Sequence, residues 1–223
     1  MGDRTDSDTD ADDSDADAGP ASIIYQVSQA LTVVVAVGVV IFLVTGAWPT
    51  LVMINGDSMQ PNIADDSMLV VTAADRYGPA DSFPTRSGVV TRSAATTADG
   101  EYRSFGGAGD VIVFETPSGE RAVHRALVYV EEGEDWRGKV DNASLAGDTC
   151  EEVRFCPAPH SGFITKGDGN TYTDQVYGVP PVTPDNMTGV ARHRVPYLGE
   201  IRGLIPLSLS AGSSSAVSAS PPG

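Results

Sequence analysis

The feature that most constrains this chain is an uncharged, almost wholly apolar segment of 26 residues at positions 23–48. A helix of this length measures about 39 Å at ~1.5 Å per residue, whereas a bilayer core of ~30 Å needs about 20 residues. Tyr25 and Trp48 lie near its two ends, where amphipathic rings favour the lipid headgroup level. Pro49 follows and cannot continue a helix. The segment therefore predicts a single transmembrane helix.

A cleavable signal peptide is the alternative interpretation of this segment. Such a peptide begins with a basic region, has an apolar stretch of only ~7–15 residues and is followed by a small-x-small cleavage site, and we expect none of these features here. Residues 1–18 are instead acidic, with eight Asp and one Arg, and the apolar stretch is much longer. We therefore interpret residues 23–48 as a membrane anchor.

The orientation of the anchor follows less directly from the sequence. The positive-inside rule counts Lys and Arg near the span and finds Arg4 before it and none in residues 49–68. Long domains cross membranes largely regardless of charge, so an outward-facing domain is permitted. We expect residues 1–20 to form a disordered acidic cytoplasmic tail, residues 49–203 an extracytoplasmic domain, and residues 204–223 a flexible tail.

The charge of the chain excludes one class of partner. The net charge of −16 comes from 30 acidic and 14 basic side chains, so nucleic acid is not expected to bind. Asp outnumbers Glu by 21 to 9, and Arg outnumbers Lys by 12 to 2. Such lysine avoidance on an acidic surface resembles proteins of salt-loving archaea, in which salt screens the self-repulsion.

The part of the chain after the apolar segment is predicted to be mainly β. Short β-type runs alternate with Gly, Pro, Asp and Ser, and no helical periodicity extends over a dozen residues. Thr116-Pro-Ser-Gly119 suits a type I turn and predicts a hairpin over residues 110–131. Two polar stretches, residues 75–107 and 133–160, are expected to be surface excursions. The candidate strands are residues 51–55, 67–72, 110–115, 121–131, 162–166 and 189–195.

The cysteines and two glycosylation patterns leave alternatives open. Cys150 and Cys156 lie six residues apart, and in an exported domain a disulfide is the favoured interpretation. With His160 they offer three zinc ligands, but no fourth is evident, so no metal or cofactor is expected. Asn142 and Asn186 begin glycosylation patterns, which matter only if the domain lies outside the cell.

A serine on a Gly-supported bend shortly after the anchor is the first candidate for chemistry. Ser58 belongs to Asn55-Gly-Asp-Ser-Met-Gln-Pro61, which can also be read as an ordinary turn. A serine nucleophile needs a base, and the chain has three histidines. Alternation in the strand around His124 places it on the apolar face with Ala122, Ala126, Val128 and Val130, and places Arg121 and Arg125 opposite. A histidine in such a position can equally be a core residue.

A Gly-rich loop supplies two carboxylates. Residues 164–174 read as a strand that ends in a loop carrying Asp168 and Asp174. Acidic residues and glycines in a loop are commonly turn residues with solvated charge, so neither Asp stands out alone.

In their order and in their residues, these segments resemble the type I signal peptidases, particularly the archaeal and endoplasmic-reticulum type. Ser58-Met59-x-Pro61 is similar to the catalytic serine box of that family, and Val123-His124-Arg125 to its base box. The strand 109–114, the acidic segment 165–174 and residues 194–199 are similar to further family segments. The resemblance covers most of residues 25–200. Bacterial relatives and self-cleaving repressors use a Lys base where this chain has His124.

The resemblance implies a signal-peptidase-like β catalytic domain that works by acyl transfer. His124 would take the Ser58 proton during attack on the scissile carbonyl and return it to the leaving amine. Asp174 would orient the imidazole, with Asp168 supporting the site. The Ser58 backbone N–H is the first expected oxyanion donor. Gly56, where bacterial relatives have a serine, and Asp57, where the family usually has glycine, are departures from the pattern.

We therefore expect a single-pass membrane serine endopeptidase that cleaves signal peptides from exported preproteins. Its partners would be those preproteins and the lipid bilayer, with the protein-export translocon as a further candidate. The resemblance implies extended recognition of a small-x-small site in substrates held in the same membrane. The alternatives are a non-catalytic membrane-tethered β-domain that binds a partner and a self-processing repressor-like protease.

Overall fold

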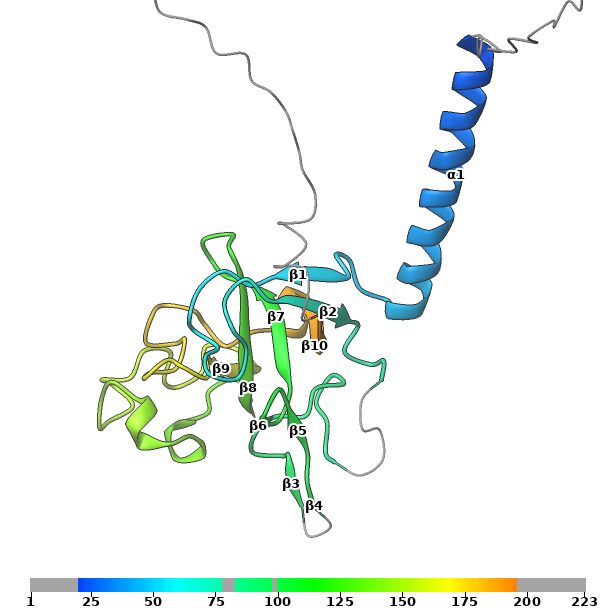
Figure 1. Ribbon diagram of the computed structural model, residues 1–223. Helices are drawn as coiled ribbons and strands as arrows, with labels where there is room; N and C mark the ends of the chain where they lie inside the picture. Colours follow the sequence, from blue (N-terminus) through cyan, green and yellow to red (C-terminus); the bar gives the residue numbers. More distant parts are fainter. Residues whose placement is uncertain (1–19, 78–82, 98–99, 196–223) are drawn as a thin grey trace, which may run out of the picture. The chain divides into compact units, whose positions relative to one another are not determined.

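The computed structural model describes residues 20–77, 83–97 and 100–195 (Figure 1). The chain divides into two compact units, one ending at Val44 and the other beginning at Thr45. The predicted disordered tail at 1–20, except its last residue, lies outside the described residues. So do the predicted tail at 204–223 and residues 196–203 of the predicted domain.

Except for its last residue, Thr45, helix α1, Pro20–Thr45, makes up the described part of the first unit, and it confirms the predicted helix. Within it, Ser22–Thr45 is long and apolar enough to cross a membrane. The helix begins and ends three residues earlier than predicted. Pro20 suits the first helical position, because its missing N–H has no intrahelical partner there. Gly46 adopts φ +67°, a left-handed conformation that ends helices and that glycine adopts without strain.

The second unit is built on a six-stranded antiparallel sheet with the strand order β1-β2-β10-β7-β8-β9. Each predicted strand is present, with ends shifted by at most two residues. The sheet confirms a mainly β domain. The strands are β1 Leu51–Met53, β2 Met68–Thr72, β7 Val111–Glu115, β8 Arg121–Val130, β9 Gly162–Lys166 and β10 Met187–Val195.

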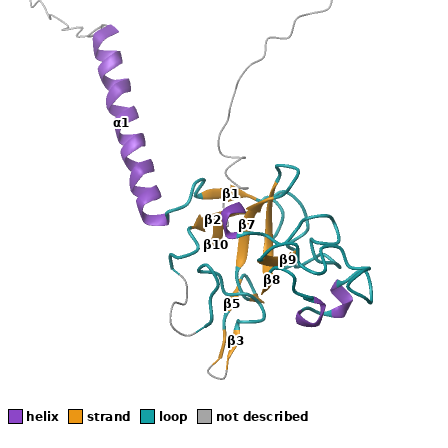
Figure 2. Cartoon of the chain, turned by 180° about the vertical axis from the view of Figure 1, so that it is seen from behind, coloured by secondary structure: helices purple, strands orange, loops and turns teal. Residues whose placement is uncertain are grey.

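Where the structure describes them, the predicted excursions contain only short elements and loops, as Figure 2 shows. The first forms two small hairpins where it is described, and the second forms two single-turn 3-10 helices. A third 3-10 helix precedes β10. These elements are β3 Thr96–Thr97, β4 Gly100–Glu101, β5 Arg103–Ser104, β6 Gly107–Ala108, η1 Arg137–Lys139, η2 Asn142–Ser144 and η3 Pro184–Asn186.

The predicted hairpin is formed by β7 and β8. The Gly119 N–H donates to the Thr116 carbonyl at 2.9 Å, and the Thr116 N–H donates to the Glu120 carbonyl at 2.8 Å. Gly119 has φ +82°, a conformation that disfavours side chains with a Cβ. The turn fixes the register in which Ile112 lies opposite His124.

The interior of the domain consists of three apolar clusters on both faces of the sheet. The first joins Val52, Met59 and Val123, and it includes both the edge strand β1 and the hairpin. The second joins residues of the excursion at 133–160, among them the fully buried Trp136, to β8 and β9. The third contains Phe114 on the other face of β7. Burial on both faces is why most of β7 is apolar without alternation.

The alternation of side chains along strand β8 differs from the prediction. Its pairing with β9 is irregular between Ala126 and Val128, so the alternation shifts by one residue. Ala126 packs in the third cluster, whereas Val128 and Val130 pack in the second. The prediction that Val128 and Val130 share the face of His124 was therefore wrong.

Candidate functional site

Ser58 lies in the turn that follows β1, and the turn is fixed by the residue next to it. Met59 is fully buried in the first cluster with Val52 and Ile54. Its carbonyl accepts a hydrogen bond from the Ile63 N–H at 2.9 Å. The apolar neighbour thus holds the turn against the core while Ser58 stays partly exposed.

Asp57 has a local role that its sequence position did not reveal. Its carbonyl accepts from the Gln60 N–H at 3.0 Å, and its carboxylate accepts a short hydrogen bond from the Gln60 side chain. Asp57 therefore closes the turn that presents Ser58, a use of aspartate that is common in turns.

His124 lies on β8, and its imidazole faces the serine. Its Nε2 is 3.1 Å from Ser58 Oγ, and its Nδ1 is 2.7 Å from Asp174 Oδ2. A carboxylate can only accept a hydrogen bond, so this geometry suits an imidazole that carries its proton on Nδ1 and accepts the Ser58 hydroxyl at Nε2. The Phe114 ring lies edge-on to the imidazole, with the ring centroids 6.1 Å apart.

Asp174 is buried, with 3% of its surface exposed, and is held by its neighbours. The Thr165 hydroxyl donates to Asp174 Oδ2 at 2.6 Å, and the Asp174 N–H donates to the Thr165 carbonyl at 2.9 Å. Strand β9 thus fixes the carboxylate that faces His124. Ser58, His124 and Asp174, which are far apart in sequence, form one hydrogen-bonded series.

The glycines of the acidic loop allow it to lie directly behind the serine. The Gly169 N–H donates to the Ser58 carbonyl at 2.8 Å. A Cβ on Gly167 would lie 2.4 Å from that same carbonyl oxygen, and one on Gly169 would lie 2.9 Å from the Asp57 carbonyl oxygen. Only glycine permits this approach of two backbones.

In the part of the chain that the structure describes, the Asp168 carboxylate hydrogen-bonds to Arg125 and Asn62 and not to His124. Its two carboxylate oxygens accept from Arg125 Nε and Nη2 at 2.7 and 2.6 Å, and Oδ2 also accepts from Asn62 Nδ2 at 2.8 Å. Burial alone would raise the pKa of Asp168, but the hydrogen bonds and charge of Arg125 lower it below its ordinary value. Asp168 therefore links the strand of His124 to the turn of Ser58.

The predicted position of Arg125 was wrong. The alternation placed it opposite the buried face, yet only 1% of its side chain is exposed. Its Nη1 donates to the Gly109 carbonyl at 2.7 Å and to the Ser104 carbonyl at 3.0 Å. The first polar excursion thus covers this face of the sheet and surrounds the guanidinium.

An open cavity of about 670 Å³ contains Ser58 and His124 in its lining. Its walls are β1 with the residues after it and the first half of β8. Among the described strands, β1 pairs only with β2, and the pairing of β8 with β9 begins at Arg125. Both walls therefore present unpaired backbone to the cavity. Val52, Ile54 and Val123 line it while being at least nine-tenths buried, which makes its apolar wall shallow.

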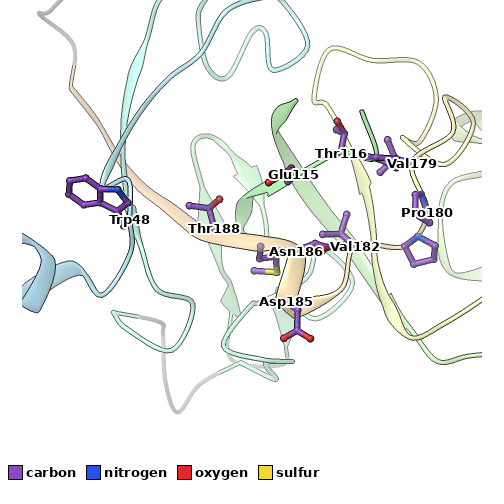
Figure 3. A pocket seen from close by; sticks show the side chains of 12 residues that line it. Trp48, Glu115, Thr116, Val179, Pro180, Val182, Asp185, Asn186 and Thr188 are labelled. Carbon is purple, nitrogen blue, oxygen red and sulfur yellow. The ribbon is translucent and has the colours of Figure 1, made fainter. Parts of the chain in front are cut away.

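A second cavity of about 670 Å³ lies beside the turn of the hairpin. Figure 3 shows Trp48 at one end of it and Pro180 at the other, with Glu115 and Thr188 between them. Its lining contains no histidine or lysine that could act as a base toward Thr116 or Thr188. Ser58 and His124, the candidate nucleophile and base, both line the cavity between β1 and β8.

The backbone N–H groups near Ser58 differ in whether they already donate a hydrogen bond. Within the described residues, no hydrogen bond uses the Ser58 N–H, so it can donate to a substrate oxygen. The Gly56 N–H is already occupied, because it donates to Asp65 Oδ1 at 2.6 Å. Gly56 therefore supplies neither the hydroxyl of the bacterial pattern nor an unoccupied N–H.

Cys150 and Cys156 form a disulfide, which is the favoured sequence interpretation. Their sulfur atoms lie near a carboxylate oxygen of Asp135 rather than near His160. Cysteines that are bonded to each other are not thiolate ligands, so this group does not fit a zinc ion. Asn142 and Asn186, the glycosylation candidates, are both exposed.

Sequence reasoning missed three contributors to the site. Asn62 gave no signal, because it is one polar residue in a polar turn. Thr165 alternates with Ile164 on β9 and could have been recognised as an inward hydroxyl facing the same side as Phe163. Arg125 directly follows His124, but strand alternation alone placed it on the wrong side.

Comparison with known proteins does not assign this chain to a family. No model of a known protein family matches the chain. A search of curated proteins also finds no match.

Proposed function

We propose that this chain is a membrane-anchored serine endopeptidase that removes signal peptides from exported preproteins. The observation that carries the proposal is the series Ser58 Oγ, His124 and Asp174 beside an open cavity. Serine attacks a carbonyl only when a base takes its proton, and a buried carboxylate on the far imidazole nitrogen keeps that base in the correct tautomer.

The reaction is an acyl transfer in two halves. Ser58 Oγ attacks the scissile carbonyl carbon as His124 Nε2 takes the hydroxyl proton, and the Ser58 N–H donates to the developing oxyanion. His124 then protonates the leaving amine as the peptide C–N bond breaks. A water molecule, deprotonated by His124, hydrolyses the ester and restores Ser58.

The shape of the cavity supports an extended peptide as the substrate. A peptide strand can pair with the unpaired backbone of β1 and of residues 121–124 in β8. The shallow apolar wall formed by Val52, Ile54 and Val123 favours small side chains next to the cleaved bond. Small residues after an apolar segment are the mark of signal peptides, and an anchor in the same membrane raises their effective concentration.

The test measures cleavage of a preprotein in detergent by the full chain and its variants. Ser58→Ala and His124→Ala are expected to lower the rate by at least about 10³-fold. Ser93→Ala and His193→Ala replace a serine and a histidine outside the series and should leave it unchanged. Equal processing by all variants would end the proposed mechanism. A wild-type chain that binds the preprotein but does not cut it would favour the non-catalytic binding domain.

A further inference from the structure

The junction between helix α1 and the domain has the sequence of a signal-peptide cleavage site. The apolar helix ends at Thr45, and Thr45-Gly46-Ala47 is a small-x-small triplet. Such a triplet after an apolar segment is what a signal-peptide-cleaving enzyme recognises. The prediction that no small-x-small site follows the apolar segment was therefore wrong.

The fold buries this triplet. Thr45 is 7% exposed and Ala47 is 3% exposed, whereas the next residue, Trp48, is 75% exposed. Ala47 packs in the first apolar cluster with Val52. The two residues that a protease would read are therefore covered, although the residue after the bond is open to solvent.

The backbone of the triplet is also fixed by hydrogen bonds. The Ala73 N–H donates to the Thr45 carbonyl at 2.8 Å, and the Thr50 hydroxyl donates to the Ala47 carbonyl at 3.1 Å. Gly46 has φ +67°, so the chain turns at the middle of the triplet. A substrate read as a strand must be extended and must offer these carbonyls to the enzyme.

The junction cannot reach the Ser58 of its own chain. Leu51 begins β1, which is one wall of the cavity, and only about 13 Å of extended chain separates it from Ala47. A bond so close to β1 cannot fold back into the cavity that β1 itself lines. Any cleavage would therefore be carried out by another copy in the same membrane.

We propose that Ala47–Trp48 is a latent cleavage site for the activity proposed above, and that burial of the junction keeps the anchor attached. The inference rests on the proposed function for its cutting enzyme. In an opened junction, Ser58 Oγ of a second copy would attack the Ala47 carbonyl carbon. The C–N bond to Trp48 would break, the serine proton would pass through His124 to the Trp48 amine, and water would release Ala47 as a carboxylate.

Two substitutions open the junction without changing the small residues. Thr50→Val removes the hydroxyl that binds the Ala47 carbonyl. Gly46→Leu changes only the middle position of the triplet, which the small-x-small pattern leaves unspecified. The backbone of Gly46 is left-handed, and a Cβ there would lie 2.8 Å from Arg76 Nε, so the substitution should displace the junction. Local cleavage follows the population of the open form, so Thr50→Val should increase it roughly 2- to 10-fold and Gly46→Leu more than about 10-fold.

The experiment places these substitutions in a full chain that also carries Ser58→Ala, so that it acts only as a substrate. Membranes with wild-type chain, or with an established signal peptidase, supply the cutting activity, and a preprotein is present in each reaction. We expect a released domain that begins at Trp48, measured by mass spectrometry, at a rate proportional to the amount of active enzyme. Adding Ala47→Leu to Gly46→Leu is the matched control, because it leaves the junction open but removes the small residue.

The outcomes separate the two proposals. Opening of the junction is verified by its sensitivity to a broad-specificity protease. If an opened junction stays intact while the preprotein is cut, the latent site is wrong and the proposed function stands. If the established enzyme releases the domain but the wild-type chain cuts neither substrate, the latent site stands and the proposed function is wrong. Release of the unopened parent at the same rate would overturn the protective role of burial.

Discussion

Asp168 and Arg125 form a two-point ion pair in which Nε and Nη2 lie 2.7 and 2.6 Å from the two carboxylate oxygens. Arg125 directly follows His124, and Asp168 directly follows Gly167, which lies against the Ser58 carbonyl. The pair therefore ties the strand of the proposed base to the loop behind the proposed nucleophile. Asp174 contacts the imidazole itself, so the two carboxylates have different expected roles.

Replacement of the two carboxylates should separate catalysis from stability. Asp174→Asn is expected to lower kcat by about 10²–10⁴-fold, because an amide facing Nδ1 favours the wrong tautomer of His124. Asp168→Asn should cost about 3 kcal/mol of unfolding free energy, because Arg125 is left buried without its carboxylate. Preprotein cleavage and urea unfolding measure the two effects. A larger loss of rate in folded Asp168→Asn than in Asp174→Asn would show that the roles are assigned wrongly.

Gly167→Ala should impair cleavage through the backbone alone. The added Cβ would lie 2.4 Å from the Ser58 carbonyl oxygen, so the serine turn or the loop must move. A displacement near 1 Å at a reacting group can cost on the order of 10²-fold in rate. Gly138→Ala is the matched control, because its Cβ meets nothing within 4 Å. Equal kcat values for both variants would contradict the close packing behind Ser58.

The ion pair predicts a specific dependence of stability on pH. The pKa of Asp168 is lowered in the folded state from its ordinary value of 3.8. Its stabilising contribution is therefore fully present above that ordinary value and is lost as the pH falls through the lowered folded value. The difference in unfolding free energy between wild type and Asp168→Asn should be constant near neutrality and shrink below about pH 4.

The control for this pH series is Asp75→Asn, which alters an exposed carboxylate. Its difference from wild type should be much smaller than that of Asp168→Asn near neutrality. A difference for Asp168→Asn that grew on acidification would mean that the ion pair does not carry the effect.

The acidic surface predicts a chain that is more stable in concentrated salt. The whole chain carries −16, of which −7 lies in residues 1–18, so the remaining −9 should weaken the folded domain by self-repulsion that salt screens. We expect the Tm to rise from dilute to multimolar KCl. A thermal melt that is the same in both solutions would count against adaptation to salt.

Much of the fold could be predicted because its signals are local. Each of the six main strands carries its own β-type run, and the hairpin carries its own turn residues, Pro117 and Gly119. The apolar helix required only length and the absence of charge. The irregular pairing of β8 at Ala126 could not be predicted, because it depends on the register with β9, which is not a property of either strand alone.

The sequence by itself determined the apolar helix, the mainly β domain, and the candidates Ser58, His124, Asp168 and Asp174. It could do so because each depends on residue type and on near neighbours in the chain. The tertiary structure decided which carboxylate faces His124, why Arg125 is buried, and why the triplet ending at Ala47 is covered. Those outcomes depend on contacts between segments far apart in sequence, and such contacts are defined only when the sheet assembles and both of its faces are covered.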